Sequence, residues 1–237
     1  MTTSAAAPRG VPDRPDLTAL LARMSGDEKH SPAATSTADV LEVLYDRVLA
    51  VDPDRPDDPH RDRFLLSKGH GPMAYYAVLA AKGFFDPAEL DGWSRFDSRL
   101  GQHPDRVLVP GVEIGSGSLG HGLPLALGTA LGLRAQGLHR PRVVVLLGDA
   151  ELDEGSNHEA IAVAGRLGLG SLTAVVVDNA SATLGWPGGL DERFAREGWA
   201  ARTVDGRDHD ALHRALTDTR PRQPLAVIAR VEPKESA

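Results

Sequence analysis

Apolar runs alternate along the chain with segments whose apolar residues recur at helical spacing. Five apolar runs predict strands at 64–66, 143–147, 172–177, 200–204 and 225–231. Segments with helical spacing or helix signals lie at 17–29, 36–49, 72–81, 123–135 and 208–219. Strands that alternate with helices predict an α/β fold with three layers, α/β/α, around a doubly wound parallel sheet.

Two of the predicted strands end in polar residues that lie one βαβ unit apart. The run at 143–147 ends in Gly148 and Asp149, and the run at 172–177 ends in Asp178 and Asn179. Because parallel strands deliver their carboxyl ends to one edge of a sheet, Asp149 and Asn179 are expected to lie side by side. Their oxygens are suited to a hard cation. The simpler interpretation is that both are ordinary turn residues.

Composition narrows the class of protein. The chain has 237 residues, of which 41% are hydrophobic, and this suits one large domain over residues 17–237 after a flexible tail at 1–16. A net charge of −7 with well-mixed signs argues against a nucleic-acid partner. The chain contains no cysteine, which excludes disulfides and thiolate zinc sites. No apolar run is long enough for a membrane span, so we expect a cytoplasmic protein with no membrane partner.

The segments GDAELDEG (148–155) and VVVDN (175–179) resemble the thiamine diphosphate motif of the transketolase family. The resemblance implies that Asp149, Asn179 and the carbonyl of Ser181 hold Mg²⁺ or Ca²⁺, which in turn holds the cofactor's diphosphate. It also implies that Gly148, Ala150 and Glu151 belong to the cofactor-binding segment. By position in the turn, the side chains of Glu151 and Asp153 are expected to be solvated.

Further segments extend the resemblance in the same order from about residue 24 to 231. They are KHSPAATSTADVLEVLY (29–45), DRFLLSKGHGPMAYYAVLAAKGFF (62–85), LGQHPD (100–105) and PGVEIGSGSLGHG (110–122). The resemblance implies three active-centre histidines. His30 would help proton transfer, His70 would contact the diphosphate side of the cofactor and the substrate channel, and His103 would contact the donor sugar. An imidazole suits such work because its ordinary pKa is close to neutral.

The glycine-rich segment before the predicted helix at 123–135 is the remaining cofactor contact. The resemblance implies that Gly117, Ser118 and Leu119 approach the thiazolium and aminopyrimidine rings, where small residues allow close backbone contact. Glu154 matches a family residue at the interface between the two active sites. A negative charge at a helix N-terminus would explain Glu154 equally well.

Four departures from the family pattern suggest a divergent member. Ala150 replaces the third residue of the family's GDG, where a left-handed backbone would cost about 1–2 kcal/mol. Leu184 stands where the family usually has Asp, and His121 replaces a common Gln. The segment ARVEPKESA also differs from the family's continuation.

The resemblance implies that the chain is one subunit of a two-component enzyme. The family activates its cofactor through a pyrimidine-binding domain, which is expected on a partner chain here, so the chain resembles the separate N-terminal subunit of a split transketolase. Such a subunit would be active with a C-terminal partner, in an α2β2 heterotetramer. It would transfer a two-carbon ketol unit from a ketose or ketose phosphate to an aldehyde-type acceptor.

Three other functions compete with this one. The first is a subunit of another thiamine diphosphate enzyme, similar to deoxyxylulose-phosphate synthase or to a 2-oxoacid decarboxylase. The second is a non-catalytic scaffold subunit, which Ala150 would favour. The third, a nicotinamide dehydrogenase, fits poorly, because no GxGxxG follows the first predicted strand.

Overall fold

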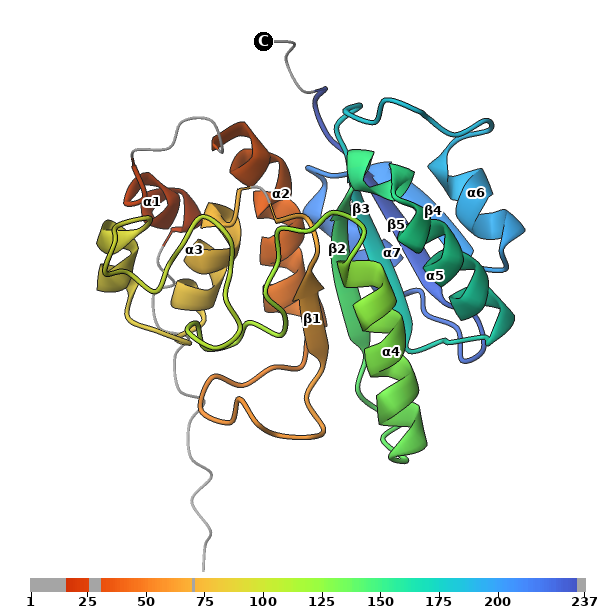
Figure 1. The fold of residues 1–237 in the computed structure, drawn as a ribbon, viewed down its shortest axis with the longest axis horizontal. Coiled ribbons are helices and arrows are strands. Elements are labelled where there is room, and N and C mark those ends of the chain that lie inside the picture. The colour runs from red at the N-terminus through yellow and green to blue at the C-terminus, as the bar shows by residue number, and fades with distance from the viewer. Residues whose placement is uncertain (1–15, 26–30, 70, 234–237) are drawn as a thin grey trace, which may run out of the picture.

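A computed structural model describes residues 16–25, 31–69 and 71–233. The described residues form a sheet of five parallel strands in the order β1-β2-β3-β5-β4 (Figure 1). The strands are β1 (Arg63–Leu66), β2 (Val143–Gly148), β3 (Leu172–Asp178), β4 (Ala200–Asp205) and β5 (Leu225–Arg230). Each predicted strand is present, and the predicted fold class is confirmed.

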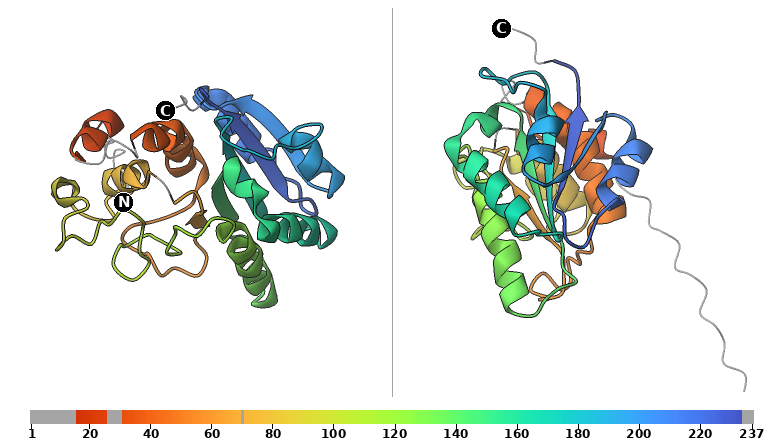
Figure 2. Two further views of the ribbon diagram at one scale, coloured as in Figure 1. Left: turned by 45° about the horizontal axis from the view of Figure 1, so that its top comes forward. Right: turned by 90° about the vertical axis from the view of Figure 1, so that its right-hand side faces the viewer.

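Helices cover both faces of the sheet and give the molecule three layers (Figures 1 and 2). One face carries α1 (Leu17–Ala22), α2 (Ser31–Val43), η2 (Leu44–Val48), α3 (Met73–Ala81) and α7 (His209–Thr217). The other face carries α4 (Gly122–Ala135), α5 (Gly155–Arg166) and α6 (Leu190–Arg196). Short 3-10 helices occur at η3 (Pro87–Gly92) and η4 (Ala150–Asp153).

The domain has two hydrophobic cores, one on each face of the sheet. Alternate residues of a strand point to opposite faces. Leu146 and Val175 therefore pack with α2 and α3, whereas Leu147 and Val176 pack with α4 and α5. Because both faces are covered, β2 is buried along its whole length and reads as a continuous apolar run.

The helices differ from the predictions in three places. Helix α1 ends at Ala22, earlier than the end near Gly26 that the sequence of the segment at 17–29 predicts. Helix α2 begins at Ser31, before the start of the predicted helical segment at 36–49. A π-helix at Leu44–Val48 follows α2 directly. Helix α6 has no counterpart among the predicted elements, because its sequence LDERFAR is mostly charged. No helix in the described ranges is long and apolar enough to cross a membrane.

All strands run in the same direction, so the turns that follow β1, β2 and β3 meet at one edge. The register aligns Leu66 with Leu146, and Gly148 with Val177. Asp149 and Asn179 therefore follow neighbouring strands at this edge, as the sequence predicts.

On the side of the sheet covered by α5, the turn after α6 packs closely against α5. Trp199 is 2% exposed and donates from Nε1 to the carbonyl of Ile161 on α5 over 2.8 Å. This contact brings the turn after α6 directly against Gly165. A methyl group at position 165 would lie 1.7 Å from the carbonyl oxygen of Glu197.

Replacing Gly165 by alanine tests this packing. Helix α5 or the turn at 197–199 would have to move, and overpacking of this kind costs about 1–3 kcal/mol. We expect Gly165→Ala to lose that much free energy of unfolding, measured by urea denaturation followed by circular dichroism.

The matched control is Gly128→Ala on α4, where a methyl group meets nothing within 4 Å. Alanine is the better helix former by up to about 1 kcal/mol, so this variant should be as stable as the parent or more so. Equal losses in the two variants would contradict the packing described for Gly165.

Candidate active site

Asp149 is the buried acid at the carboxyl edge of the sheet. It follows β2 directly and is 2% exposed. Its Oδ2 accepts hydrogen bonds from the backbone N–H of Ser181 (2.6 Å) and of Ala182 (3.0 Å), and its Oδ1 accepts from the Ser181 hydroxyl (2.6 Å). The turn after β3 thus wraps around the carboxylate at the end of β2.

Asn179 lies in that same turn. Its Oδ1 is buried and has no hydrogen-bond partner among the described residues. An unsatisfied buried acceptor costs about 1–3 kcal/mol, and this oxygen is available to bind a ligand. Ala180 has a φ of 55°, a left-handed conformation that turns Ser181 back toward Asp149. The three predicted metal-binding residues therefore lie at the same edge of the sheet. Asp149 follows β2, and Asn179 and Ser181 lie in the turn after β3.

The donor set suits a hard cation that shares its ligands with a phosphate. The described residues hold no group of three or more His, Cys, Asp or Glu that could bind a metal. A cation here would therefore depend on one carboxylate, the amide oxygen of Asn179, a backbone carbonyl and oxygens from a ligand. Mg²⁺ is commonly held in this way, by few protein ligands and by substrate phosphates.

Glu151 is not the solvated turn acid that the sequence suggested. It is 2% exposed and accepts hydrogen bonds from the Ser67 hydroxyl, from the amide of Gly120 (3.1 Å) and from the amide of Gly148 (3.3 Å). Burial raises the pKa of the Glu151 carboxyl, and the hydrogen bond from Ser67 is the largest opposing effect. The sequence pattern did not single out Ser67, although it belongs to the SKGHG segment that carries part of the family resemblance.

The glycine-rich turn at 115–122 packs tightly against its neighbours. A methyl group on Gly120, whose φ is 77°, would lie 2.5 Å from Cβ of Glu154. One on Gly122 would lie 2.2 Å from Cβ of Ser67. Glycine is needed at both positions, because the turn touches the loop after β1 on one side and the start of α5 on the other.

His103 is the one predicted histidine that lies within the described residues. Its imidazole packs against the backbone of Gly117, where an added Cβ would be 2.9 Å from His103 Cδ2. Gly69 of the SKGHG loop lies on the same side, and its own added Cβ would be 3.1 Å from that atom. His103 therefore joins the turn at 115–122 to the loop after β1. His30 and His70 lie outside the described residues.

The remaining predicted residues surround this centre. Gly148 ends β2, and Ala150 opens η4 without a positive φ, so its methyl group causes no backbone strain. Ser118 and Leu119 lie in the exposed part of the glycine-rich turn, and Leu119 is 44% exposed. Glu154 is exposed at the start of α5 and makes no side-chain capping bond.

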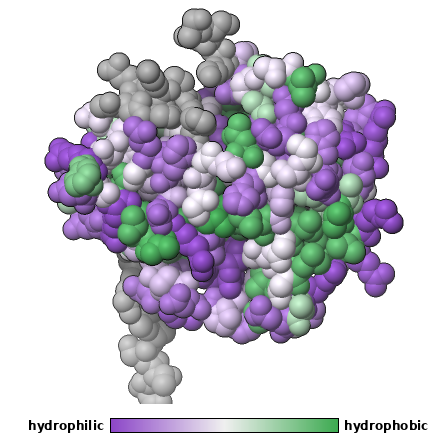
Figure 3. All heavy atoms as spheres, in the orientation of Figure 1, coloured by the Kyte–Doolittle hydropathy of each residue, from purple (hydrophilic) through white to green (hydrophobic). Residues whose placement is uncertain are grey.

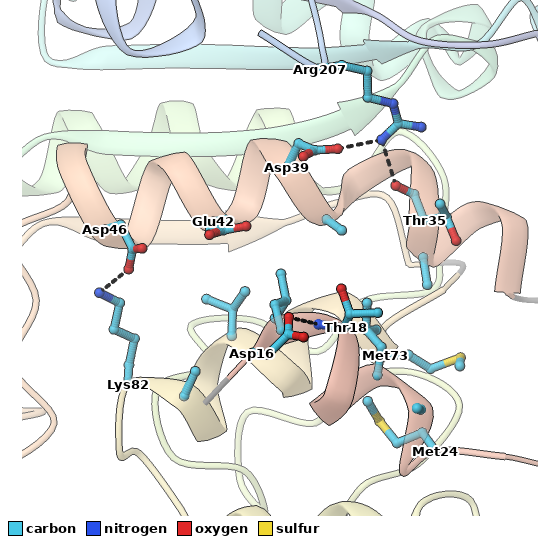
Figure 4. A pocket seen from close by; sticks show the side chains of 17 residues that line it. Asp16, Thr18, Met24, Thr35, Asp39, Glu42, Asp46, Met73, Lys82 and Arg207 are labelled. Atoms are coloured by element: carbon cyan, nitrogen blue, oxygen red, sulfur yellow. Dashed lines mark hydrogen bonds and ion pairs between the residues drawn. The ribbon is translucent and has the colours of Figure 1, made fainter. Parts of the chain in front are cut away.

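A large cavity lies away from this centre. It measures about 700 Å³ and opens between α1, α2 and α3 (Figure 4). Asp39 and Glu42 of α2 and Asp46 of η2 line it. Asp39 pairs with Arg207, and Asp46 pairs with Lys82. A smaller cavity of about 170 Å³ lies beside Asp149 itself.

Comparison with known proteins identifies the domain. Residues 22–231 match the family described as transketolase, thiamine diphosphate binding domain. The structure superposes on a transketolase from Pichia stipitis in complex with sedoheptulose 7-phosphate, with a TM-score of 0.76 and 25% identity. That match covers 90% of this chain and 35% of the transketolase, so the chain spans about a third of that protein.

Two relatives have lengths closer to that of this chain. A protein of Rhodococcoides fascians named ferredoxin fas2 is 59% identical over 216 residues, which are 91% of this chain and 71% of the relative. One subunit of the apulose-4-phosphate transketolase of Actinobacillus succinogenes is 36% identical over 207 residues, with coverages of 84% and 75%. Ferredoxin clusters are held by cysteine thiolates, and the 237 residues contain no cysteine.

The family match spans nearly all of the described residues. It includes the strand ends, the glycine-rich turn at 115–122 and the acidic turn at 150–153, which is η4. The chain therefore belongs to the transketolase family and carries the thiamine diphosphate binding domain of that family.

Proposed function

We propose that this chain is the diphosphate-binding subunit of a two-component, thiamine diphosphate-dependent transketolase. The enzyme would transfer a two-carbon ketol unit from a ketose or ketose phosphate to an aldehyde-type acceptor. The observation that carries the proposal is the buried, unpartnered oxygen of Asn179, which lies in the turn that wraps the buried carboxylate of Asp149.

The residues present fit the cofactor and its metal. Mg²⁺ or Ca²⁺ would be held by Asp149, by Oδ1 of Asn179 and by the carbonyl of Ser181, all of which are oxygen donors. When bound, thiamine diphosphate supplies carbanion chemistry that the protein orients and polarises. The anchoring end of that cofactor would lie against Gly148, Ala150 and the acidic turn.

The chain's other residues would bind and orient the substrate. His103 lies over Gly117, so its imidazole faces the same turn that would contact the cofactor rings. In this place it would donate to, or accept from, the hydroxyls of the donor sugar. His30 and His70 keep the roles predicted for them in proton transfer and in the substrate channel.

A partner chain would complete the site. The chain covers 75% of a relative named as a subunit but 35% of a larger transketolase, which supports a division of the enzyme between two chains. The partner would carry the pyrimidine-binding domain in an α2β2 assembly. The exposed residues Leu119 and Glu154 lie at the open side of the site, where the partner would approach.

Apolar residues continue that open side along α4 and α5. Leu125 is 36% exposed and Val163 is 41% exposed, and apolar side chains are visible over this face (Figure 3). Such a face is suited to burial against another chain. Sugar phosphates as donors are supported by the names of the Actinobacillus relative and of the Pichia complex.

Removing the carboxylate at the end of β2 tests the anchor. Asp149→Ala deletes the charged metal ligand, and we expect affinity for thiamine diphosphate with Mg²⁺ to fall about 100-fold or more in the complex with the partner. Calorimetric titration measures the change. Asp57→Ala removes an exposed acid from the loop before β1 and should leave the affinity unchanged. Tight, metal-dependent binding by Asp149→Ala would contradict the assignment.

Restoring the family's glycine at position 150 distinguishes an active subunit from a non-catalytic scaffold subunit. Ala150 already has an ordinary backbone conformation, so Ala150→Gly should change cofactor affinity less than about threefold. Its free energy of unfolding should fall by up to about 1 kcal/mol through backbone entropy. If the parent binds no cofactor with its partner and Ala150→Gly does, the scaffold function is favoured for the natural chain.

Reconstitution tests the two-component claim. We expect the purified chain alone to show no ketol transfer, and the chain mixed with a pyrimidine-domain partner to transfer a two-carbon unit. The assay follows disappearance of a ketose phosphate and formation of the lengthened acceptor by mass spectrometry. Steady turnover by this chain without a partner would refute the division of labour.

A further inference from the structure

One buried carboxylate contacts the loop after β1, the glycine-rich turn and the end of β2. Oε1 of Glu151 accepts from the Ser67 hydroxyl in the loop after β1 and from the Gly120 amide in the glycine-rich turn. Its Oε2 accepts from the Gly148 amide at the end of β2. Its own backbone carbonyl accepts from Nδ2 of Asn157 on α5 over 2.6 Å. A side chain that only filled space would not need this set of donors.

The contact with Gly148 takes the place of a hydrogen bond that a longer β1 would make. Strand β1 ends at Leu66, which is aligned with Leu146, so no β1 residue reaches the level of Gly148. The carboxylate of Glu151 accepts that amide where a further strand residue would otherwise do so. The end of β2, and with it the neighbouring Asp149, is therefore held by Glu151 on the β1 side and by the β3 turn on the other.

The contact with Ser67 extends the unit further. The Ser67 oxygen donates to Glu151 and itself accepts from the amide of Gly122 over 3.0 Å. Hydrogen bonds that are linked in a water-poor site reinforce one another. The Gly122 amide, the Ser67 hydroxyl and the Glu151 carboxylate thus form a continuous chain that joins the start of α4 to the acidic turn.

We propose that Glu151 is a positioning residue, which fixes the loop after β1, the glycine-rich turn and the end of β2 at the spacing required by the bound cofactor. The inference rests on the proposed function, because the spacing matters only if thiamine diphosphate binds there. Glu151 acts through these backbone segments and has no part in the reaction itself.

The isosteric variant Glu151→Gln gives a sharp test. The amide retains one acceptor for Ser67 and Gly120, but its NH₂ group then faces the N–H of Gly148, donor against donor. The end of β2 should therefore shift while the volume of the core is preserved. Asp57→Asn, at an exposed acid in the loop before β1, is the control.

The full chain in complex with its partner is assayed for the KM of thiamine diphosphate and for kcat at saturating cofactor. We expect Glu151→Gln to raise the KM about tenfold or more and to leave kcat within about twofold, because the loops are misplaced but the reacting groups are intact. Amide exchange should become faster at Gly120 and Gly148. Asp57→Asn should match the parent in every measurement.

Ser67→Ala approaches the same unit from its other end. It should raise the KM in the same direction, and the double variant should be little worse than Glu151→Gln alone, because both changes break one connected unit. An unchanged KM and unchanged exchange in a folded Glu151→Gln variant would overturn the positioning role and leave the proposed function intact. Failure of the parent complex to bind thiamine diphosphate would contradict the proposed function and this inference together.

Discussion

The carboxylate of Asp149 is the group on which the candidate site depends. It is a charge held at 2% exposure, which is tolerable only because two backbone amides and a hydroxyl donate to it. Those donors all come from the turn after β3, so the same contacts that stabilise the buried charge also bring Asn179 to the end of β2. The geometry of the sheet edge follows from satisfying this single acid.

A second buried acid stands on the other side of β2. Glu151 accepts a hydrogen bond from the amide of Gly148, whereas Asp149 accepts hydrogen bonds from the amides of Ser181 and Ala182. The end of β2 therefore lies between two carboxylates with different partners. The glycines at 120 and 122 allow the neighbouring turn to come close enough to join this arrangement. The anchoring end of the site is buried at Asp149 and Glu151, whereas Leu119 and Glu154 are exposed. This difference is consistent with the proposed division of the site between two chains.

The sequence could predict what depends on local pattern and on the direction of strands. Apolar runs located every strand, and the parallel direction then required Asp149 and Asn179 to meet at one edge. The bond from Ser67 to Glu151 could not be predicted, because 84 residues separate them and an acid in a turn is normally solvated. Helix α6 could not be predicted either, because its burial rests mainly on Phe194, which packs against Trp199.

The position of the metal is tested most directly in a crystal of the two-chain complex grown with Mn²⁺ and thiamine diphosphate. We predict one anomalous scattering peak at the carboxyl edge of the sheet, within bonding distance of Asp149, of Oδ1 of Asn179 and of the cofactor's diphosphate. A peak remote from both side chains, or a diphosphate bound without metal at another edge of the domain, would contradict the assignment of this edge as the cofactor anchor.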